Sequence, residues 1–252
     1  ENLSLHGIRE VTLLGQNVNS YGKTLPQGAD FSQLLEAIGK IPGIKRIRFT
    51  TSHPKDLSDR LVASFGKIPS LCEHIHLPVQ AGSNKVLKKM NRGYTVDQYK
   101  EKVAELRGVS PEISITSDMI VGFPGEEEDD FQETLQLMRE VRFDGLFSFK
   151  YSQREGTPAA GMNGQVPDKT KSERLNVLQS LQEAHTLEKN REMIGRYQEV
   201  LVEGPSRKTP GDMTGRTRNN RIVNFAGGCE FVGSMVIVKI VDAFSHSLRG
   251  EL

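Results

Sequence analysis

Polar or flexible residues follow each of the first four predicted strands of the chain. Gln16 comes after the first strand, Ser52 after the second, Gln80 after the third, and Gly122 with Phe123 after the fourth. Because ligands of parallel βα folds bind where strands end and loops begin, we expect these residues to line one site. Amides, a hydroxyl and open backbone suit a polar, zwitterionic cofactor with ribose hydroxyls and an adenine edge. Each residue alone is also an ordinary turn or capping residue, so the argument depends on four successive strand ends.

Three further features lie near these strand ends. Residues 118–125 hold two glycines and a proline, which let the backbone approach a flat ligand closely. Arg92 is a candidate clamp for a carboxylate through its planar guanidinium group, with an ordinary surface arginine as the alternative. His53 precedes a proline, where we expect a local hydrogen bond rather than acid–base chemistry. The acidic run 126–130 is interpreted as structural, because the helix dipole favours negative charge in a first helical turn.

Patterns for self-contained catalysis are absent from the sequence. It has no Ser/His/Asp order, Walker loop or HExxH motif, so any reaction would depend on a cofactor. Cys72 and Cys229 are its two cysteines, far apart and outside any CxxC pattern. They provide neither a four-cysteine metal site nor a disulfide framework, and we predict no metal ligands in this chain. Both cysteines are expected to be small buried apolar residues.

A basic segment lies near the C-terminal end of a chain whose charge is otherwise balanced, with 33 basic and 32 acidic residues. Residues 205–224 contain five basic side chains and one acidic side chain, interspersed with threonine and asparagine. Such a composition suits phosphate and base-edge contacts of RNA, although a solvated loop is the alternative. The predicted RNA-binding residues are Arg207, Lys208, Arg216, Arg218, Asn220 and Arg221.

The elements that position these residues are predicted from hydrophobic periodicity. Strand-like runs alternate with helical patterns over the first two-thirds of the chain, which is typical of βα units and a parallel sheet. Asp30 is the expected N-cap of the first full helix, and Thr95 with Gln98 forms a predicted capping box. A long polar helix is expected over residues 168–194. The predicted strands are residues 10–14, 46–51, 73–79, 113–121 and 145–151.

A second domain is predicted after this helix. From Arg196 onward, short β-rich runs at 197–202, 221–225 and 234–241 are separated by Gly, Pro and Asn turns. This pattern favours a small antiparallel barrel of OB-like size. We therefore predict an α/β domain over residues 1–191 and an all-β domain over residues 192–252.

The first residues resemble the end of an element rather than its beginning. Residues 1–6 have the pattern of a last helical turn with Gly7 as its cap, and no start signal precedes them. The first parallel strand would also expose a long edge, so we expect at least one further strand upstream. The chain has no apolar run of the roughly 20 residues that span a bilayer, so a cytoplasmic protein without membrane contact is predicted.

Five segments together resemble the MiaB family of tRNA methylthiotransferases, which are radical S-adenosylmethionine (SAM) enzymes. The resemblance covers essentially the whole chain. Its last segment resembles the TRAM domain, the RNA-binding module of this family. The matching segments are EVTLLGQNV at 10–18, RFTTSHP at 48–54, LPVQAGS at 77–83 with MNR at 90–92, SDMIVGFPGE at 117–126, and GRTRNNR at 215–221.

The resemblance implies a partial radical SAM (βα) barrel followed by a TRAM barrel. It implies methylthiolation at C2 of N6-isopentenyladenosine at position 37 of tRNA, with the anticodon stem-loop as partner and the sulfur donor unidentified. It also implies S-adenosyl-L-methionine and [4Fe–4S] clusters, whose CxxxCxxC ligands this chain lacks, so that the chain alone is expected to be inactive. The residues implied to line the cofactor site are Gln16, Ser52, Gln80, Arg92, Asp118, Ile120, Val121, Gly122 and Phe123.

Three alternatives stay open at this point. A RimO-type methylthiotransferase would act on a ribosomal-protein aspartate, but the arginine- and asparagine-rich residues 216–221 suit RNA better. A second alternative is an RNA-binding module without activity of its own. A βα-barrel enzyme for phosphorylated metabolites is the third, and the sequence offers no glycine-rich loop with a lysine for the phosphate.

Overall fold

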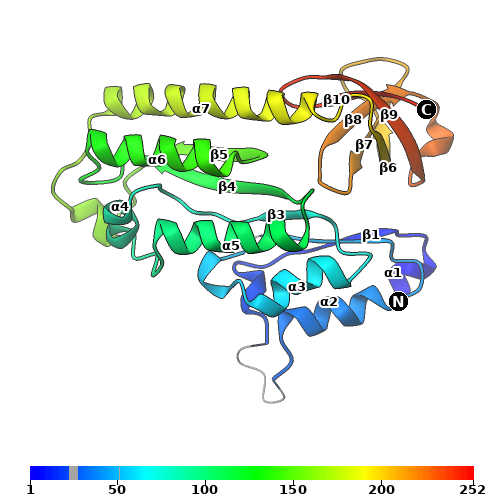
Figure 1. The fold of residues 1–252 in the computed structure, drawn as a ribbon, viewed down its shortest axis with the longest axis horizontal. Coiled ribbons are helices and arrows are strands. Elements are labelled where there is room, and N and C mark those ends of the chain that lie inside the picture. Colours follow the sequence, from blue (N-terminus) through cyan, green and yellow to red (C-terminus); the bar gives the residue numbers. More distant parts are fainter. Residues whose placement is uncertain (23–27, 51) are drawn as a thin grey trace.

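The computed structural model describes residues 1–22, 28–50 and 52–252 of the chain. In this part of the chain, a curved sheet with helices on one side is joined to a closed β-barrel by one long helix (Figure 1). The predicted α/β domain and all-β domain are therefore both present. Thr51, the predicted last residue of the second strand, lies outside the described residues.

All strands of the sheet are parallel and lie side by side in sequence order. β1 pairs with β2, and β3, β4 and β5 form the rest. An isolated bridge between Ile47 and Leu71 joins the two parts. The predicted strands are confirmed with shorter ends, most of all β3. The bounds are β1 Glu10–Leu13, β2 Arg46–Phe49, β3 His74–His76, β4 Ser114–Val121 and β5 Gly145–Lys150.

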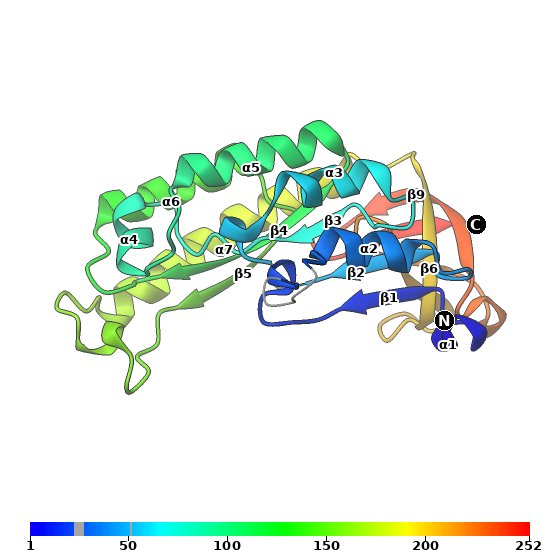
Figure 2. The same ribbon diagram turned by 90° about the horizontal axis from the view of Figure 1, so that it is seen from below.

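The helices pack on one face of the sheet, and Figure 2 shows no helix over the opposite face of its described strands. Asp30 and Thr95 each form the predicted capping box with a glutamine three residues later. The core between sheet and helices includes Leu35, Phe49 and Met138, each at most 1% exposed. The helices are α1 Asn2–Leu5, α2 Phe31–Gly39, α3 Asp59–Lys67, α4 Asn84–Lys89, α5 Val96–Val109 and α6 Glu128–Val141, with short 3-10 turns η1 Val18–Ser20, η2 Pro54–Asp56 and η3 Pro158–Gly161.

Helix α7, Asp168–Arg191, is the predicted long helix and ends three residues early. It packs along β5 and α6 and runs to the barrel (Figure 1). The predicted domain boundary follows its last residue and stays a prediction. None of the described helices is long and apolar enough to span a membrane.

The barrel closes in the order β10-β8-β7-β6-β9 around a core that includes Val200, Phe225 and Ile240. The three predicted runs correspond to β6, β8 and β9, whereas β7 and β10 were not predicted. The interpretation of residues 205–224 as one loop is wrong, because β7 and β8 pair there as a hairpin. Asp212 and Gly215 disfavour a strand, so the β7 segment is held by its pairing with β6 and β8 rather than by its propensity. The bounds are β6 Tyr197–Pro205, β7 Asp212–Thr217, β8 Ile222–Ala226, β9 Met235–Ala243 and β10 Leu248–Glu251, with the turn η4 Cys229–Phe231.

The two cysteines have different environments. Cys72 is buried before β3, as predicted, and burial raises the pKa of its thiol to about 11. The prediction for Cys229 is wrong, because this thiol is exposed in η4 on the barrel surface. The glycine pair Gly227–Gly228 leads the chain out of the barrel before Cys229, which a count of cysteines does not reveal.

Candidate functional site

Gln80 joins the ends of β3 and β4. Its backbone N–H donates to the Asp118 carbonyl at 2.9 Å, and its carbonyl accepts from the Ile120 N–H at 2.9 Å. Gln80 has a φ of 78°, which side chains other than glycine seldom adopt. Such backbone persists only where its surroundings fix it, and it clusters at functional sites. The structure thus brings three predicted cofactor residues together at the carboxyl end of the sheet.

Arg92 lies at the same end of the sheet. Its guanidinium group donates to the Tyr94 hydroxyl at 3.1 Å and to the Pro78 carbonyl at 3.4 Å, beside the end of β3. The Tyr94 hydroxyl in turn donates to the Val79 carbonyl at 2.9 Å. Among the ion pairs of the described residues, none involves Arg92. Its charge is therefore available to an anionic group such as a carboxylate.

The buried carboxylate of Glu126 holds the turn after β4 in place. The Gly122 N–H donates to Glu126 Oε1 at 2.9 Å, and Arg174 donates to the same oxygen at 2.7 Å. Burial raises the pKa of Glu126, while the Gly122 N–H and Arg174 oppose this shift. The Phe123 ring is buried against Tyr151, 5.1 Å between centroids, so a contact of Phe123 with a ligand would have to involve its backbone.

The acidic run after this turn is structural, as predicted. Glu127 caps α6 in a box with Asp130, and both carboxylates also hold Lys85. Val121, the last residue of β4, points into the core.

The loops after β1 and β2 are fastened to each other. Asn19 donates to the His53 carbonyl at 3.0 Å and accepts from the His53 N–H at 3.1 Å. The ring of His53 accepts from the Lys55 N–H, which is the predicted local hydrogen bond. Ser52 is buried, and its hydroxyl has no hydrogen-bond partner among the described residues. A buried hydroxyl without a partner fits a polar group of a ligand. Gln16 is exposed beyond β1.

Two of the predicted RNA-binding arginines reach across to the first domain. Arg218 donates to both oxygens of Glu73, at 2.8 Å each, and to the carbonyls of Pro69 and Leu71. Arg221 donates to Asp144 Oδ1 at 2.7 Å. Their contact with RNA stays a prediction, but both charges already have acidic partners.

The other predicted RNA-binding residues form no ion pair with the first domain among the described residues. Arg216 pairs with Glu203 at 2.9 Å and donates to Asn220, whose side chain lies 3.4 Å from His74. Arg207 and Lys208 are exposed and take part in none of the ion pairs formed by the described residues. They are the cations of this set most available to a phosphate.

Comparisons with known proteins assign both domains of the chain to known families. The sequence profile of the Radical SAM superfamily matches residues 1–138, more than half of the chain. The chain belongs to the Radical SAM superfamily. The TRAM domain profile matches residues 191–252, which contain the barrel. The fold of the chain also resembles that of coproporphyrinogen III oxidase from Escherichia coli, a radical SAM enzyme, with a TM-score of 0.54 and 13% identity over 86% of this chain and 58% of that chain.

Relatives of much higher identity are named tRNA-2-methylthio-N(6)-dimethylallyladenosine synthase. The protein of Syntrophus aciditrophicus is 57% identical over 99% of this chain, and that of Syntrophobacter fumaroxidans is 56% identical over 99%. These relatives confirm the resemblance to the MiaB family. This chain spans 54% of the length of the first relative and 55% of the second, about half of each.

Two arginines of β2 fasten the TRAM barrel to the radical SAM sheet. Arg46 is fully buried and donates to the Arg216 carbonyl at 2.7 Å and to the Glu199 carbonyl at 2.8 Å. Arg48 donates to the Arg218 carbonyl at 2.9 Å and to the Thr217 carbonyl at 2.8 Å. The sequence signal for this junction is a pair of alternating arginines in an otherwise apolar strand, RIRF. We did not predict it.

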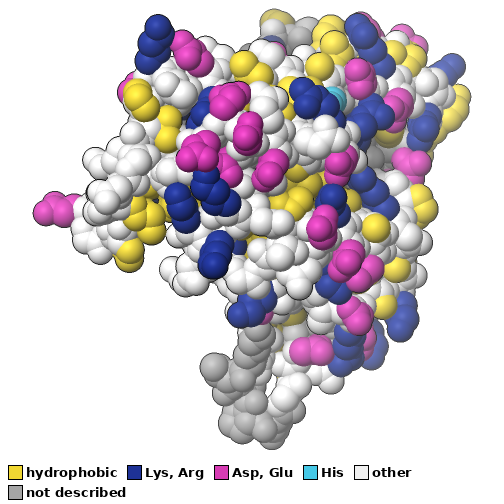
Figure 3. Space-filling view, turned by 60° about the vertical axis from the view of Figure 1, so that its left-hand side comes forward, with side chains coloured by type: hydrophobic (Ala, Val, Ile, Leu, Met, Phe, Trp, Pro, Cys, Tyr) yellow, Lys and Arg dark blue, Asp and Glu magenta, His cyan; other side chains and the backbone are white. Residues whose placement is uncertain are grey.

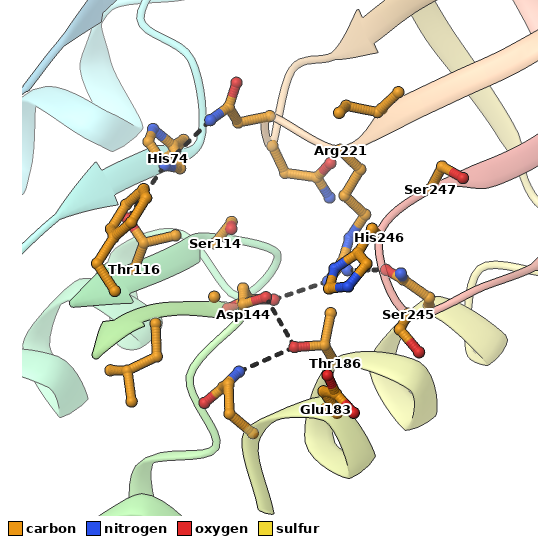
Figure 4. A pocket seen from close by; sticks show the side chains of 18 of the residues that line it. His74, Ser114, Thr116, Asp144, Glu183, Thr186, Arg221, Ser245, His246 and Ser247 are labelled. Carbon is orange, nitrogen blue, oxygen red and sulfur yellow. Dashed lines mark hydrogen bonds and ion pairs between the residues drawn. The ribbon is translucent and has the colours of Figure 1, made fainter. Parts of the chain in front are cut away.

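A cavity of about 630 Å³ lies at the same junction (Figure 4). His74 and Gln182 on its wall each bury a polar atom without a partner among the described residues, and burial lowers the pKa of His74 to about 3. The cavity adjoins the amino ends of β4 and β5, opposite to the predicted cofactor residues. The residues that line it belong to the sheet and its loops, to α7 and to the TRAM barrel. Those labelled in Figure 4 are His74, Ser114, Thr116, Asp144, Glu183, Thr186, Arg221, Ser245, His246 and Ser247.

Charge on the outer surface is mixed. Figure 3 shows Lys and Arg side chains among Asp and Glu over the face that it presents. Among the described residues, no group of three or more His, Cys, Asp or Glu side chains could hold a metal ion.

Proposed function

We propose that this chain is the radical SAM and TRAM part of a tRNA methylthiotransferase. The reaction replaces the hydrogen at C2 of N6-dimethylallyladenosine, at position 37 beside the anticodon, with a methylthio group. The observation that carries this proposal is 57% identity, over 99% of the chain, to a synthase of that name. An RNA substrate also accounts for a TRAM barrel that exposes Arg207 and Lys208. Because tRNA is the substrate, we propose a cytoplasmic location.

The residues at the carboxyl end of the sheet fit S-adenosyl-L-methionine. Arg92 offers a positive charge to its carboxylate, and the Ser52 hydroxyl offers a buried polar partner. Gln80, with its backbone fixed to β4, offers an amide at the same end for the ribose or adenine edge. The buried Glu126–Arg174 pair keeps the Gly122 turn in place beneath the ligand. Gln16 and the backbone of residues 118–123 complete the proposed set.

A [4Fe–4S] cluster that binds S-adenosyl-L-methionine would supply the one electron needed for reductive cleavage of its S–C5′ bond. Cys72 and Cys229 lie in different domains, so we propose that cysteines outside these 252 residues hold the cluster. The part of this chain is to bind and orient the cofactor and to hold the RNA.

A domain exchange tests the proposed reaction. This chain would replace the corresponding half of the Syntrophus aciditrophicus relative, which it matches over 250 residues. In cells without their own methylthiolation, we expect the exchanged protein to restore the methylthio nucleoside in tRNA, measured by mass spectrometry of digested tRNA. Loss of the product in the exchanged protein, with the unmodified relative active and both equally abundant, would refute the proposal.

Cofactor binding is tested separately by titration calorimetry on the exchanged protein. Removing a charge-assisted partner of a carboxylate costs about 1.5–3 kcal/mol, so Arg92→Ala should weaken S-adenosyl-L-methionine binding by about tenfold to a hundredfold. Arg60→Ala is the matched control, because Arg60 pairs with Asp30 and Glu36 on the surface. Equal affinity of the Arg92 and Arg60 variants would exclude Arg92 from the site.

A further inference from the structure

The open face of the radical SAM sheet carries two exposed phenylalanines. Phe147 is 60% exposed and Phe149 is 52% exposed, although both lie within strand β5. Their neighbours point the other way, since Ser148 accepts a hydrogen bond from Gln179 and Lys150 pairs with Asp168, both on α7. Side chains alternate along a strand, so the two rings face away from α7, onto the side that Figure 2 shows without helices. Two exposed rings on one sheet face form a contiguous apolar patch, and patches of this kind are candidates for a binding surface.

The pairing of β5 with β4 places an aliphatic residue beside Phe149 and polar residues beside Phe147. Phe149 lies opposite Ile120 on β4, and Phe147 lies opposite Asp118. Asp118 is 3.3 Å from His76 Nε2, and the His76 ring packs against Phe147 at 5.8 Å between centroids. The surface is therefore apolar at Ile120 and Phe149 and polar at Asp118 and His76.

This surface is next to the proposed cofactor site. Ile120 comes two residues before Gly122, a distance of about 7 Å along a strand. Gln80, from the same proposed site, hydrogen-bonds through its backbone to Asp118 and Ile120. A ligand on Phe149 would thus lie within reach of a cofactor bound at the strand ends.

We propose that Phe147, Phe149 and Ile120 bind the dimethylallyl-bearing adenine of the RNA and select it over plain adenine. This assignment rests on the proposed function. A nucleobase stacks on an exposed aromatic ring, and the branched five-carbon substituent suits the apolar end of the surface. Asp118 and His76 provide hydrogen-bonding groups for the polar edge of the base. The match between a half-apolar, half-polar surface and a base with one apolar substituent favours this occupant over a second copy of the chain.

The test measures RNA affinity in the exchanged protein by fluorescence anisotropy, with two synthetic anticodon stem-loops. One carries adenosine and the other N6-dimethylallyladenosine at the target position. We expect the unmutated protein to prefer the dimethylallyl RNA by about tenfold, from burial of a small apolar group. Phe149→Ala and Phe147→Ala should bring this ratio close to one, because each removes the apolar contact with the dimethylallyl group and weakens that RNA more than the adenosine RNA. Phe149→Leu, which keeps an apolar side chain, should retain part of the preference.

Phe244→Ala is the matched control, since Phe244 is 51% exposed but lies in the TRAM barrel; its preference ratio should not change. Equal affinity of the unmutated protein for both RNAs would overturn this inference and leave the proposed function standing. A preference that survives in both phenylalanine variants would also overturn it. Failure to bind either RNA would overturn the inference together with the RNA partner. If the variants instead abolish a dimer seen by sedimentation, the occupant is a second copy and the inference is wrong.

Discussion

Replacing Arg46 with methionine should loosen the TRAM barrel from the radical SAM sheet. Methionine keeps an apolar stem but removes the buried guanidinium group and its bonds to the Arg216 and Glu199 carbonyls. A hydrogen bond from a charged donor contributes about 1.5–3 kcal/mol, so the two together contribute about 3–6 kcal/mol. The Glu199 carboxylate is 38% exposed, and its ion pair adds less than about 1 kcal/mol. Arg46 Nε has no partner among the described residues, and its removal offsets about 1 kcal/mol.

The expected loss is therefore about 2–6 kcal/mol, a large part of the roughly 5–15 kcal/mol that stabilises a typical domain. Urea unfolding followed by circular dichroism measures this loss, and hydrogen exchange by mass spectrometry shows whether the barrel opens separately. Arg60→Met is the control, because its surface pairs with Asp30 and Glu36 should contribute about 0–1 kcal/mol. If Arg46→Met and Arg60→Met shift the urea midpoint equally, the reasoning about this junction is wrong.

Three more predictions concern RNA binding, pH dependence and thiol reactivity. Replacing both Arg207 and Lys208 with glutamine should weaken RNA binding and reduce the slope of log affinity against log salt concentration by about 1 per cation. A salt titration measures this slope, and an unchanged slope would show that neither side chain contacts a phosphate. Burial lowers the pKa of His74 from near 6.5 to about 3. As pH falls from 6.5 to about 3, His74 is therefore protonated in the unfolded chain before it is protonated in the folded one. The free energy of unfolding decreases over this pH range. His74→Gln should flatten this dependence in urea titrations at several pH values. In a thiol assay with a disulfide reagent, Cys229 should react in the native protein and Cys72 only after denaturation, because Cys72 is buried with its pKa raised to about 11.

Local signals were sufficient for most of the radical SAM sheet. Alternating strand and helix patterns predicted all five of its described strands, and Asp30 and Thr95 predicted two helix starts, because caps and periodicity depend on residues close in sequence. β7 was missed because its residues form a strand only when β6 and β8 pair with it. The burial of a cysteine likewise depends on tertiary position, and Cys229 shows that residue type does not determine it.

For the site, sequence reasoning found residues but not their partners. It grouped Gln80 with Asp118 and Ile120 correctly at one sheet end, since strand ends of a parallel sheet meet there. It counted Arg218 and Arg221 as free positive charge, whereas each pairs with an acid far away in sequence. Long-range ion pairs of this kind leave no periodic pattern in a single sequence.

The way in which β2 holds the TRAM barrel has a consequence for modular exchange among related proteins. Arg46 and Arg48 donate to main-chain carbonyls of residues 216–218, a group that every amino acid carries. Docking therefore depends on the path of the hairpin backbone and places little demand on which side chains it displays. The surface of the barrel can diverge toward different RNAs while its attachment is preserved, provided that the two arginines of the strand are retained.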